Sequence, residues 1–437
     1  MREALTPMDA PGTAAPCALP GSPLSLAEAG IDACVHCGFC LPACPTYLAL
    51  EDENDSPRGR IVLMRGLLDG DVLPTDPVVQ QHIDRCLGCR ACETACPSGV
   101  PYGHLLEATR ATLRATKAPP LIARLILRVF ATPLLLRLAL FGGRIVRNSG
   151  LATALAALPG RIGAGMAMLA GTRPVMKTAP WQAHGSGDRG DVTLLTGCVM
   201  QGLLTATNEA TGRVLTVNGY RMTQTPAQGC CGALHSHAGD LDTARALARV
   251  NIAAFEATPQ ALIVVNSAGC GAMLKEYAHL LHDEPEWRER AEAVGARTRD
   301  ASELLAAAGP KPASLPAPLR ITYDAPCHLQ HAQRITTPPL QVLAAIGNVT
   351  HIPLDDSDQC CGSAGIYNLI EPDVSDAVLA PKLRCIADTG ASVVITGNPG
   401  CLMQISAGLL RSGSATRVVH PIDLLDAAYA ADALRVR

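Results

Sequence analysis

The sequence predicts a mixed α+β and α/β protein, in which a helical, cysteine-rich N-terminal domain precedes two copies of a small α/β domain. Two observations predict this fold class. A four-cysteine motif occurs twice between residues 34 and 97, and a longer pattern containing the triplet Cys-Cys-Gly occurs twice after residue 190. The composition permits such a fold, because 437 residues with 48% hydrophobic side chains can bury the cores of two or three domains.

The N-terminal motif reads "CVHCGFCLPACP" from residue 34 and "CLGCRACETACP" from residue 86. Both copies have the spacing C-x2-C-x2-C-x3-C-P, with which ferredoxin-type domains bind two [4Fe-4S] clusters. Each cluster takes three thiolates from one copy and the fourth from the other copy. This rule assigns Cys34, Cys37, Cys40 and Cys96 to one cluster, and Cys86, Cys89, Cys92 and Cys44 to the other.

Zinc and disulfide bonds fit this motif less well than clusters do. Zinc also accepts four thiolates, but two separated CxxC pairs usually supply them instead of a close triplet. Disulfides are not expected, because the chain begins without a secretory signal pattern and reduced compartments keep thiols free. We therefore expect two [4Fe-4S] clusters as cofactors of this region.

The segment "DSPRGRIVLMRGLL" between the two motifs predicts a helix. Ser56 is a good N-cap and Pro57 suits the first helical position. Arg58 and Arg60 are expected to lie in solvent at this helix start. Within and beside the two motifs, three glycines are expected to let backbone amides approach the cluster sulfides. They are Gly38, Gly88 and Gly99.

The C-terminal pattern indicates a duplicated domain. The cysteines of the second copy follow those of the first by 129, 130 and 131 residues, which is a small drift for a whole domain. Each copy alternates short apolar strands, such as "DVTLL" and "ALIVV", with helical stretches, so a small parallel or mixed sheet is expected in each. The cysteines follow strand ends, where open α/β sheets bind their ligands. The two copies are expected to pack as a pseudo-twofold pair.

Each copy, called a CCG half below, contributes four cysteines to a second candidate metal site. The eight are Cys198, Cys230, Cys231 and Cys270 in the first half and Cys327, Cys360, Cys361 and Cys401 in the second. Adjacent cysteines bind neighbouring irons more readily than one metal ion, so one or two further iron–sulfur clusters are predicted. Buried structural thiols and a vicinal disulfide stay open as alternatives.

The remaining cysteines and the nearby histidines follow no recognisable ligand pattern. Cys17 and Cys385 are treated as incidental. Four histidines neighbour the C-terminal cysteines and are expected to be exposed loop residues, although a hydrogen bond to a cluster sulfide or proton transfer is the alternative. They are His235, His237, His328 and His331.

The domain boundaries follow from these patterns. We expect a mobile tail over 1–30, the ferredoxin-type domain over 31–118, a helical connector and hinge over 119–190, and CCG halves over 191–315 and 316–437. The connector contains apolar, arginine-bearing helices over 121–146 with a break near Pro133, too rich in charge to span a membrane. They suit a membrane surface, a partner subunit or packing on the protein's own domains.

Several function classes are excluded by the sequence. A net charge of -3 gives no basic footprint for nucleic acid. Gly185, Gly187 and Gly190 have dinucleotide-binding spacing, but no strand precedes them and a strand follows, so the match is rejected. No P-loop or nucleophile motif occurs, and no catalytic residue is assigned. A chain with clusters and no organic cofactor of its own is expected to be an electron-carrying subunit.

The motifs together resemble a known family. "CVHCGFCLPACPTY", "SPRGRI", "DRCLGCRACETACPSGV", "GCCGALHSH", "SAGCGAMLKEY", "CHLQHAQ" and "CCGSAGIYNL" look like those of the iron–sulfur subunit of bacterial glycolate oxidase, from about residue 31 to the C-terminus. The resemblance implies that FAD-binding partner subunits oxidise glycolate to glyoxylate and that this chain passes the electrons to a membrane quinone. The missing secretory signal predicts a cytoplasmic protein, and the segment over 121–172 predicts association with the cytoplasmic face of the inner membrane through the complex. Related complexes that oxidise lactate or glycerol 3-phosphate remain alternatives.

The CCG halves also resemble those of heterodisulfide reductase, which hold a non-cubane cluster. In that family the last cysteines form a CxxC pair, whereas here Met273 and Gln404 occupy the second positions. Two further hypotheses therefore stay open: the CCG halves catalyse disulfide or quinone reduction, or they serve only as a platform for the flavoprotein subunits.

Overall fold

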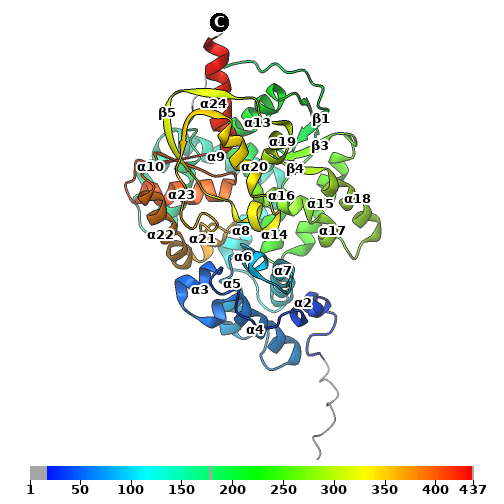
Figure 1. Ribbon diagram of the computed structural model, residues 1–437. Coiled ribbons are helices and arrows are strands. Elements are labelled where there is room, and N and C mark those ends of the chain that lie inside the picture. The colour runs from blue at the N-terminus through cyan, green and yellow to red at the C-terminus, as the bar shows by residue number, and fades with distance from the viewer. Residues whose placement is uncertain (1–16, 177–179, 436–437) are drawn as a thin grey trace, which may run out of the picture.

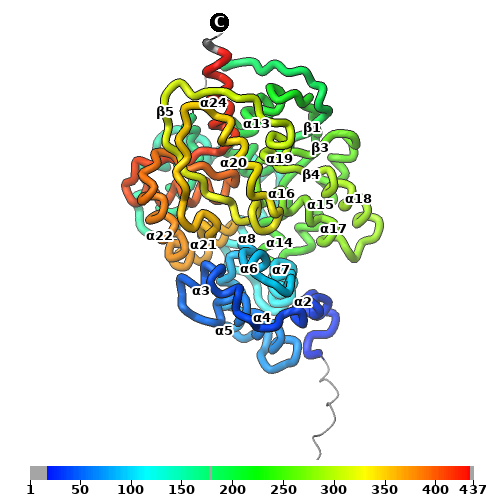
Figure 2. Tube along the Cα trace, in the orientation of Figure 1, coloured from blue at the N-terminus to red at the C-terminus, as the bar shows by residue number. Residues whose placement is uncertain are grey.

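The computed structural model describes residues 17–176 and 180–435 and confirms the predicted mixed α/β fold class. A small helical lobe contains the N-terminal cysteine motifs, and a larger lobe contains the two CCG halves (Figure 1). The first half, in green, and the second, in yellow to orange, lie side by side above the small lobe (Figures 1 and 2). The connector helices, in cyan, lie behind the large lobe in this view.

The small lobe is built from short helices around one core. Buried Met64, Leu67, Ile83 and Leu105 belong to this core. The elements are α1 (Pro23–Leu26), α2 (Glu28–Asp32), α3 (Pro45–Leu50), the 3-10 turn η1 (Glu53–Asp55), α4 (Pro57–Asp69), α5 (Pro77–Asp84), α6 (Ala91–Ala95) and α7 (Tyr102–Arg114). The start of α4 is as predicted: Ser56 Oγ accepts a hydrogen bond from the Gly59 amide at 2.9 Å, and Pro57 follows the cap.

The prediction of a mobile tail over 1–30 is wrong for its described part. Leu24 of α1 is fully buried, and its amide donates to Thr112 Oγ1 of α7 at 3.1 Å. Cys17 packs partly buried against the same core. Residues 1–16 lie outside the described residues. A segment of tail-like composition therefore supplies several apolar side chains to the small core, among them Leu19, Leu24 and Ala27.

Arg60 also differs from its prediction. Its side chain has no solvent exposure and forms an ion pair with buried Asp55, with Nη2 3.1 Å from Oδ1. Arg58, two residues earlier, is only half-buried and bonds Glu53 at 2.8 Å. The helical period explains the difference, because positions 58 and 60 face opposite sides of α4.

The described part of the connector comprises four helices that pack against both CCG halves. They are α8 (Leu121–Ala131), α9 (Pro133–Asn148), α10 (Leu151–Leu155) and α11 (Gly160–Gly171). The break at Pro133 is confirmed. Among the described residues no single helix is long and apolar enough to cross a membrane; α8 and α9 pass that test only when joined, and they meet at 105°.

The connector packs on its own protein along one side only. α11 packs against α23 (Pro399–Arg411), and buried Arg147 of α9 donates to the carbonyl of Leu203 at 2.7 Å. On α8 only Ala123 and Leu127 are buried. The glycine-containing segment before residue 191 leads into a strand, so it lacks the strand-to-helix context of a dinucleotide site.

Each CCG half contains a four-stranded parallel sheet. The first has the order β2-β1-β3-β4 and the second the matching order β6-β5-β7-β8, so the duplication extends to topology. The strands are β1 (Asp191–Leu194), β2 (Arg221–Thr223), β3 (Leu262–Val265), β4 (Thr298–Asp300), β5 (Ala313–Tyr323), β6 (Ile346–His351), β7 (Val393–Ile395) and β8 (Arg417–Val419). The sequence did not indicate β4 and β8, which are three-residue edge strands.

Helices cover both sheets. In the first half they are α12 (Val199–Leu203), α13 (Thr205–Val217), α14 (Ala233–His237), α15 (Leu241–Phe255), α16 (Ala268–Lys275), α17 (Tyr277–Leu280), α18 (Pro285–Arg297) and α19 (Ala301–Ala308). In the second they are the π-helical turn η2 (His328–Ala332), α20 (Thr337–Ala344), α21 (Tyr367–Ile370), α22 (Pro372–Asp388), α23 and α24 (Pro421–Arg435).

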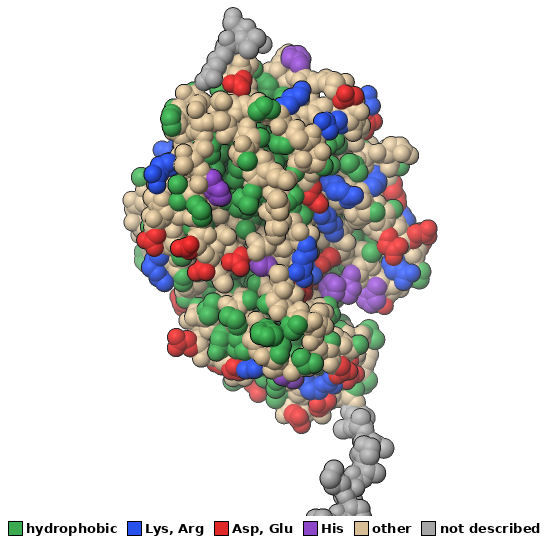
Figure 3. Space-filling model, viewed as in Figure 1, with side chains coloured by type: hydrophobic (Ala, Val, Ile, Leu, Met, Phe, Trp, Pro, Cys, Tyr) green, Lys and Arg blue, Asp and Glu red, His purple; other side chains and the backbone are tan. Residues whose placement is uncertain are grey.

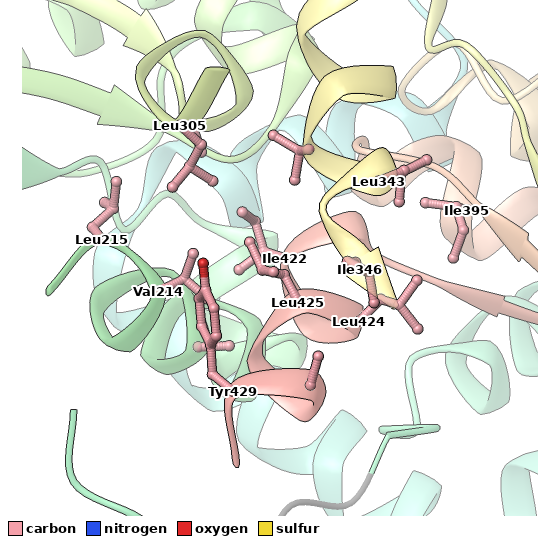
Figure 4. Close-up of a cluster of buried hydrophobic side chains, with 14 of the residues drawn as sticks. Val214, Leu215, Leu305, Leu343, Ile346, Ile395, Ile422, Leu424, Leu425 and Tyr429 are labelled. Atoms are coloured by element: carbon pink, nitrogen blue, oxygen red, sulfur yellow. The ribbon is translucent and has the colours of Figure 1, made fainter. Parts of the chain in front are cut away.

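A shared hydrophobic core joins the two halves. Helix α24 packs against α13 of the first half and β5 of the second. Figure 4 shows Ile422, Leu425 and Tyr429 of this helix between Val214 of the first half and Leu343 of the second, all of them buried. The two sheets are therefore held in a fixed relation, which fixes their cysteine-bearing edges as well.

Candidate functional site

The first ferredoxin-type cysteine set opens to the surface of the small lobe. Cys34, Cys37, Cys40 and Cys96 line one small cavity together with Cys92. Cys37 is the exposed member of the set. Gly38 and Gly99 have φ values of +85° and +68°, in the left-handed region that only glycine adopts readily. The four cysteines that the sequence assigned to one cluster thus converge in space.

The second set lies deeper. Cys44, Cys86, Cys89 and Cys92 are all buried. Cys92 lies among Cys86, Cys44 and Cys40, so the borrowed fourth cysteine meets the second motif. The Gly88 amide donates to Cys86 Sγ at 3.4 Å and the Tyr102 hydroxyl lies 3.8 Å from it; these are donors of the kind that tune a cluster.

Cys89 connects the two lobes. Its side chain packs in one buried cluster with Cys360 and Cys327, both in the second CCG half. The contact with Cys360 and burial raise the pKa of Cys89 well above its ordinary value. The second ferredoxin-type set and the second CCG set are therefore in direct contact.

The four cysteines of the first CCG half form one buried group. Cys198 and Cys231 both lie in hydrogen-bonding contact with Cys230, and Cys231 Sγ is 3.3 Å from Cys270 Sγ. Hydrogen bonds from Cys198 and Cys231 lower the pKa of Cys230 well below its ordinary value, and the same contact raises the pKa of Cys198. Thiols bind a metal as thiolates, and the lowered pKa of Cys230 favours that deprotonated form.

The second half repeats this arrangement. Cys360 lies in hydrogen-bonding contact with Cys327, Cys361 and Cys89, and Cys361 contacts Cys401. The Gly362 amide donates to Cys360 Sγ at 3.4 Å. In this half, five thiols therefore converge instead of four, because Cys89 is added from the other lobe.

Strand ends explain why each group of four forms. Cys198, the adjacent pair Cys230–Cys231 and Cys270 follow the carboxyl ends of β1, β2 and β3, and the second half places its cysteines after β5, β6 and β7 in the same order. In a parallel sheet these ends share one edge. Cysteines far apart in sequence are therefore neighbours by topology.

Asn398 bridges the two CCG groups, a role that the sequence did not indicate. Its Nδ2 donates to Cys401 Sγ at 3.4 Å, while its Oδ1 accepts from the Gly269 amide, next to Cys270, at 3.2 Å. It ends the loop after β7, at the N-cap of α23. A lone asparagine after a strand carries no sequence signature for such a contact.

The prediction that the four histidines are exposed is wrong. His235 and His331 are buried, and His237 and His328 are half-buried. Burial, followed by the charges of His237 and Arg90, lowers the pKa of His328 to about 3, so this ring stays neutral. The ring of His328 stacks on His237 with centroids 5.2 Å apart. The histidines belong to the junction between the lobes, which sequence proximity alone could not indicate.

The donor sets fit iron–sulfur clusters. Each set offers four thiols, which is the ligand type that these clusters take. In two of the sets a backbone amide also donates to a cysteine sulfur. Among the described residues, Asp52, Asp55 and His82 also lie close enough together to hold a metal ion. There, however, Asp55 already forms ion pairs with Arg60 and Arg85. We assign no metal to that group.

Comparisons with known proteins agree with this donor chemistry. Residues 30–100 match the family "4Fe-4S dicluster domain", and residues 192–275 and 321–406 match "Cysteine-rich domain". A probable glycolate oxidase iron-sulfur subunit of Bacillus subtilis (strain 168) is 39% identical over 411 residues, which cover 90% of this chain and 92% of the relative. The chain belongs to the family of glycolate oxidase iron–sulfur subunits.

Two more relatives are consistent with this membership. The glycolate oxidase iron-sulfur subunit of Escherichia coli (strain K12) is 35% identical over 407 residues, covering 92% of this chain and 95% of the relative. The lactate utilization protein A of an Exiguobacterium species is 30% identical over 237 residues, which cover 54% of this chain and 97% of the relative. The predicted iron–sulfur chemistry is thereby confirmed in kind.

The chain departs from the CxxC pairs of heterodisulfide reductase at two buried positions. Met273 is part of the hydrophobic core of the first half. Gln404 accepts a hydrogen bond from Asn368 at 2.8 Å and donates one to Ser375 at 2.9 Å. Both side chains therefore have structural roles and supply no thiol. Among the described residues, each CCG half itself contributes four thiols to its site.

Proposed function

We propose that this chain is the electron-transfer subunit of a glycolate-oxidising complex, which takes electrons from FAD-binding partner subunits and delivers them to a membrane quinone. The contact between Cys89 and Cys360 carries this proposal, because it joins the two kinds of cysteine site into one continuous series. The family membership of the chain over nine-tenths of its length supports the glycolate partner.

In this proposal two [4Fe-4S] clusters bind to the ferredoxin-type sets, and one further cluster binds to each CCG group. The ligands are Cys34, Cys37, Cys40 and Cys96; then Cys44, Cys86, Cys89 and Cys92; then Cys198, Cys230, Cys231 and Cys270; and finally Cys327, Cys360, Cys361 and Cys401. A bound cluster accepts and releases one electron at a time. The chain's own residues hold the sites, shield the buried ones from water and keep them adjacent.

The surface around Cys37 is the proposed entry for electrons. Val35 and Phe39 flank Cys37 and are 67% and 63% exposed, and Leu48 and Val62 of the same lobe are also exposed. Hydrophobic side chains gather on this lobe in the space-filling view (Figure 3). An exposed apolar patch beside a redox site suits a docked flavoprotein, because it would bury the patch and shorten the electron's path.

Helices α8 and α9 are the proposed contact with the membrane. Their exposed residues include Leu125, Leu134, Leu138 and Phe141, at 59–66% exposure. The sequence contains no Asp or Glu from residue 108 to residue 187, but it contains eleven Lys and Arg residues there. An apolar face with only positive charge fits the headgroup region of an anionic bilayer. A peripheral position on the cytoplasmic face of the inner membrane is therefore part of the proposal.

The test is reduction of the purified complex by candidate donors. The chain is co-expressed with its flavoprotein partners and purified without oxygen, and glycolate, lactate and glycerol 3-phosphate are added in turn. We expect glycolate to bleach the cluster absorption and produce the electron paramagnetic resonance signal of reduced clusters. Reduction by lactate or glycerol 3-phosphate alone would replace the proposed donor, and reduction by none of them would refute the electron-transfer role.

A further inference from the structure

We propose that the cavity between α5, α7, α8, α14 and α21 binds the head group of a lipid-soluble quinone. This inference rests on the proposed function and names the place where electrons leave the chain. Three observations on the cavity support it: its size and lining, its position between a cluster site and the membrane-facing helix, and the polar groups at its wall.

The cavity has the size and polarity of a site for one substituted ring. Its volume is about 210 Å³. An apolar cavity of about 150 Å³ is enough for benzene, so a ring with substituents fits. Its apolar wall comes from Leu87, Leu113, Leu127, Leu234 and Ile366. These residues belong to the small lobe, the connector and both CCG halves, so the site exists only in the assembled fold.

The cavity lies between a redox site and the surface proposed to meet the bilayer. Cys86, a proposed ligand of the second ferredoxin-type cluster, is part of its lining. Ala123 and Leu127 of α8 also line the cavity, while Leu121 and Leu125 of the same helix are 75% and 64% exposed. Helix α8 therefore separates the cavity from solvent, with one face lining the cavity and the other on the protein surface. An apolar acceptor dissolved in a membrane would reach the cavity along this helix.

The helix is fixed over the cavity by a specific contact. Nε2 of His235, in α14, lies 3.0 Å from the carbonyl oxygen of Leu127. His235 is fully buried. This contact joins α8 to α14 of the first CCG half beside the cavity.

Polar groups at the wall suit the two oxygens of a quinone. Arg114 and Lys117 line one part of the cavity together with Asp84. The Nη2 of Arg114 lies 3.2 Å from Asp240 Oδ2, whereas its Nη1 is buried with no hydrogen-bond partner among the described residues. His237 lines the cavity as well, and its Nδ1 is 2.9 Å from Glu107 Oε1. No described residue bonds its Nε2, which is left for a ligand. A buried donor without a partner, such as Nη1 of Arg114, destabilises the fold, and a carbonyl oxygen of a bound quinone would accept its hydrogen bond.

The reaction balances with groups already named. The partner's oxidation of glycolate to glyoxylate releases two electrons and two protons. Reduction of a quinone to its hydroquinone consumes two electrons, which arrive singly through the Cys86 site, and two protons. His237, paired with Glu107, donates a proton to one quinone oxygen and regains it from solvent through its exposed edge; solvent supplies the proton to the other oxygen.

The first experiment measures binding and not turnover. The anaerobic complex in detergent is illuminated with a short-chain azido-quinone, and the labelled peptides are identified by mass spectrometry. We expect labels within residues 110–127, 234–238 and 364–371, and their loss when unlabelled quinone is in excess. Labels confined to other segments would overturn the proposal.

Variants then test the cavity. Leu127→Trp fills it, and Arg114→Gln removes the unpartnered donor while keeping the cavity open. Both are expected to lower labelling and quinone reduction by about tenfold, which corresponds to about 1.4 kcal/mol. The control Val250→Trp places the same side chain at an exposed site on α15, 51% exposed, and should leave both unchanged.

A soluble dye separates this inference from the proposed function. Reduction of ferricyanide by glycolate should stay normal in Leu127→Trp and Arg114→Gln, since the dye needs no cavity. If both variants keep normal quinone reduction and labelling, the cavity is not the site. If wild-type clusters are not reduced by glycolate at all, the proposed function fails, while labelling of the cavity can still be read.

Discussion

Replacing Arg60 by alanine should remove the second ferredoxin-type cluster and destabilise the small lobe. The Arg60 side chain donates to the His82 carbonyl at 2.6 Å, to the Asp55 carbonyl at 2.5 Å and to Thr46 Oγ1 at 3.1 Å. It thereby ties the segments that carry Cys44 and Cys86 to each other. In the variant these carbonyls and the Asp55 carboxylate stay buried and lose their main donor.

The size of the effect follows from burial. Breaking a buried ion pair by removing one partner costs about 3–5 kcal/mol, because the other charge is left uncompensated. Arg85, whose Nη1 is 3.2 Å from Asp55 Oδ2, compensates part of that charge, so we expect about 3 kcal/mol. Iron analysis of anaerobically purified protein should show about four fewer irons per chain than wild type. The midpoint of urea unfolding, followed by circular dichroism, should fall.

The matched control is Arg58→Ala on the same helix. Its partner Glu53 is half exposed, and its second acceptor, the His36 carbonyl at 3.2 Å, lies at the first cysteine set, so the loss should be below about 1 kcal/mol and the second cluster should keep its iron. A double variant that also changes Asp55 to Leu should recover part of the stability, because no uncompensated carboxylate remains. Equal iron content and equal midpoints in Arg60→Ala and Arg58→Ala would contradict the reasoning.

Three further predictions concern the large lobe and the connector. Cys361→Ser should lower the iron content by up to about four atoms per chain, whereas Cys385→Ser should not; equal iron in both would leave the second CCG group without a cluster. Burial lowers the pKa of His420 to about 4, and its Nε2 bonds the Asn266 carbonyl at 3.0 Å. The unfolded ring has a pKa of about 6.5, so as pH falls from about 6.5 to 4 only the unfolded chain gains the proton and stability should drop by roughly 1–3 kcal/mol. Urea midpoints between about pH 7 and 4.5 should show a smaller drop in His420→Gln, and an identical drop would exclude this residue as the cause. Leu138→Glu should weaken binding of the complex to anionic vesicles in a flotation assay by roughly tenfold, and unchanged flotation would place the membrane contact elsewhere.

Spacing was enough to predict which cysteines converge, because metal ligands impose strict geometry. A close triplet of cysteines with a fourth in a second copy has few uses, and the structure brings Cys44 to Cys92 as that rule requires. The first three strands of each CCG half were equally predictable, since short apolar runs between helical stretches alternate in both copies. Helix starts with a strong local cause, such as Ser56 followed by Pro57, were also correct.

The incorrect predictions share a different cause. Whether Leu24, Arg60 or His235 is buried depends on what packs over it, and the covering residues come from elsewhere in the chain. Local composition marked the first thirty residues as a tail, but Leu24 lies against α7, eighty-eight positions from its partner Thr112. A three-residue edge strand such as β8 forms because β7 lies beside it, and no window of sequence shows that.

The sequence by itself determined which thiols are the candidate iron ligands, how they divide into sets and that the second half of the chain is a duplicated α/β domain. These properties depend on residue type and spacing, which chemistry restricts to few outcomes. The order of the sites was decided only by the tertiary structure. Cys89 meets Cys360, Asn398 joins the two CCG groups, and five segments enclose the cavity beside Cys86. These residues are far apart in the sequence. They become neighbours because hydrophobic packing of α24 and of the two lobes holds their segments together.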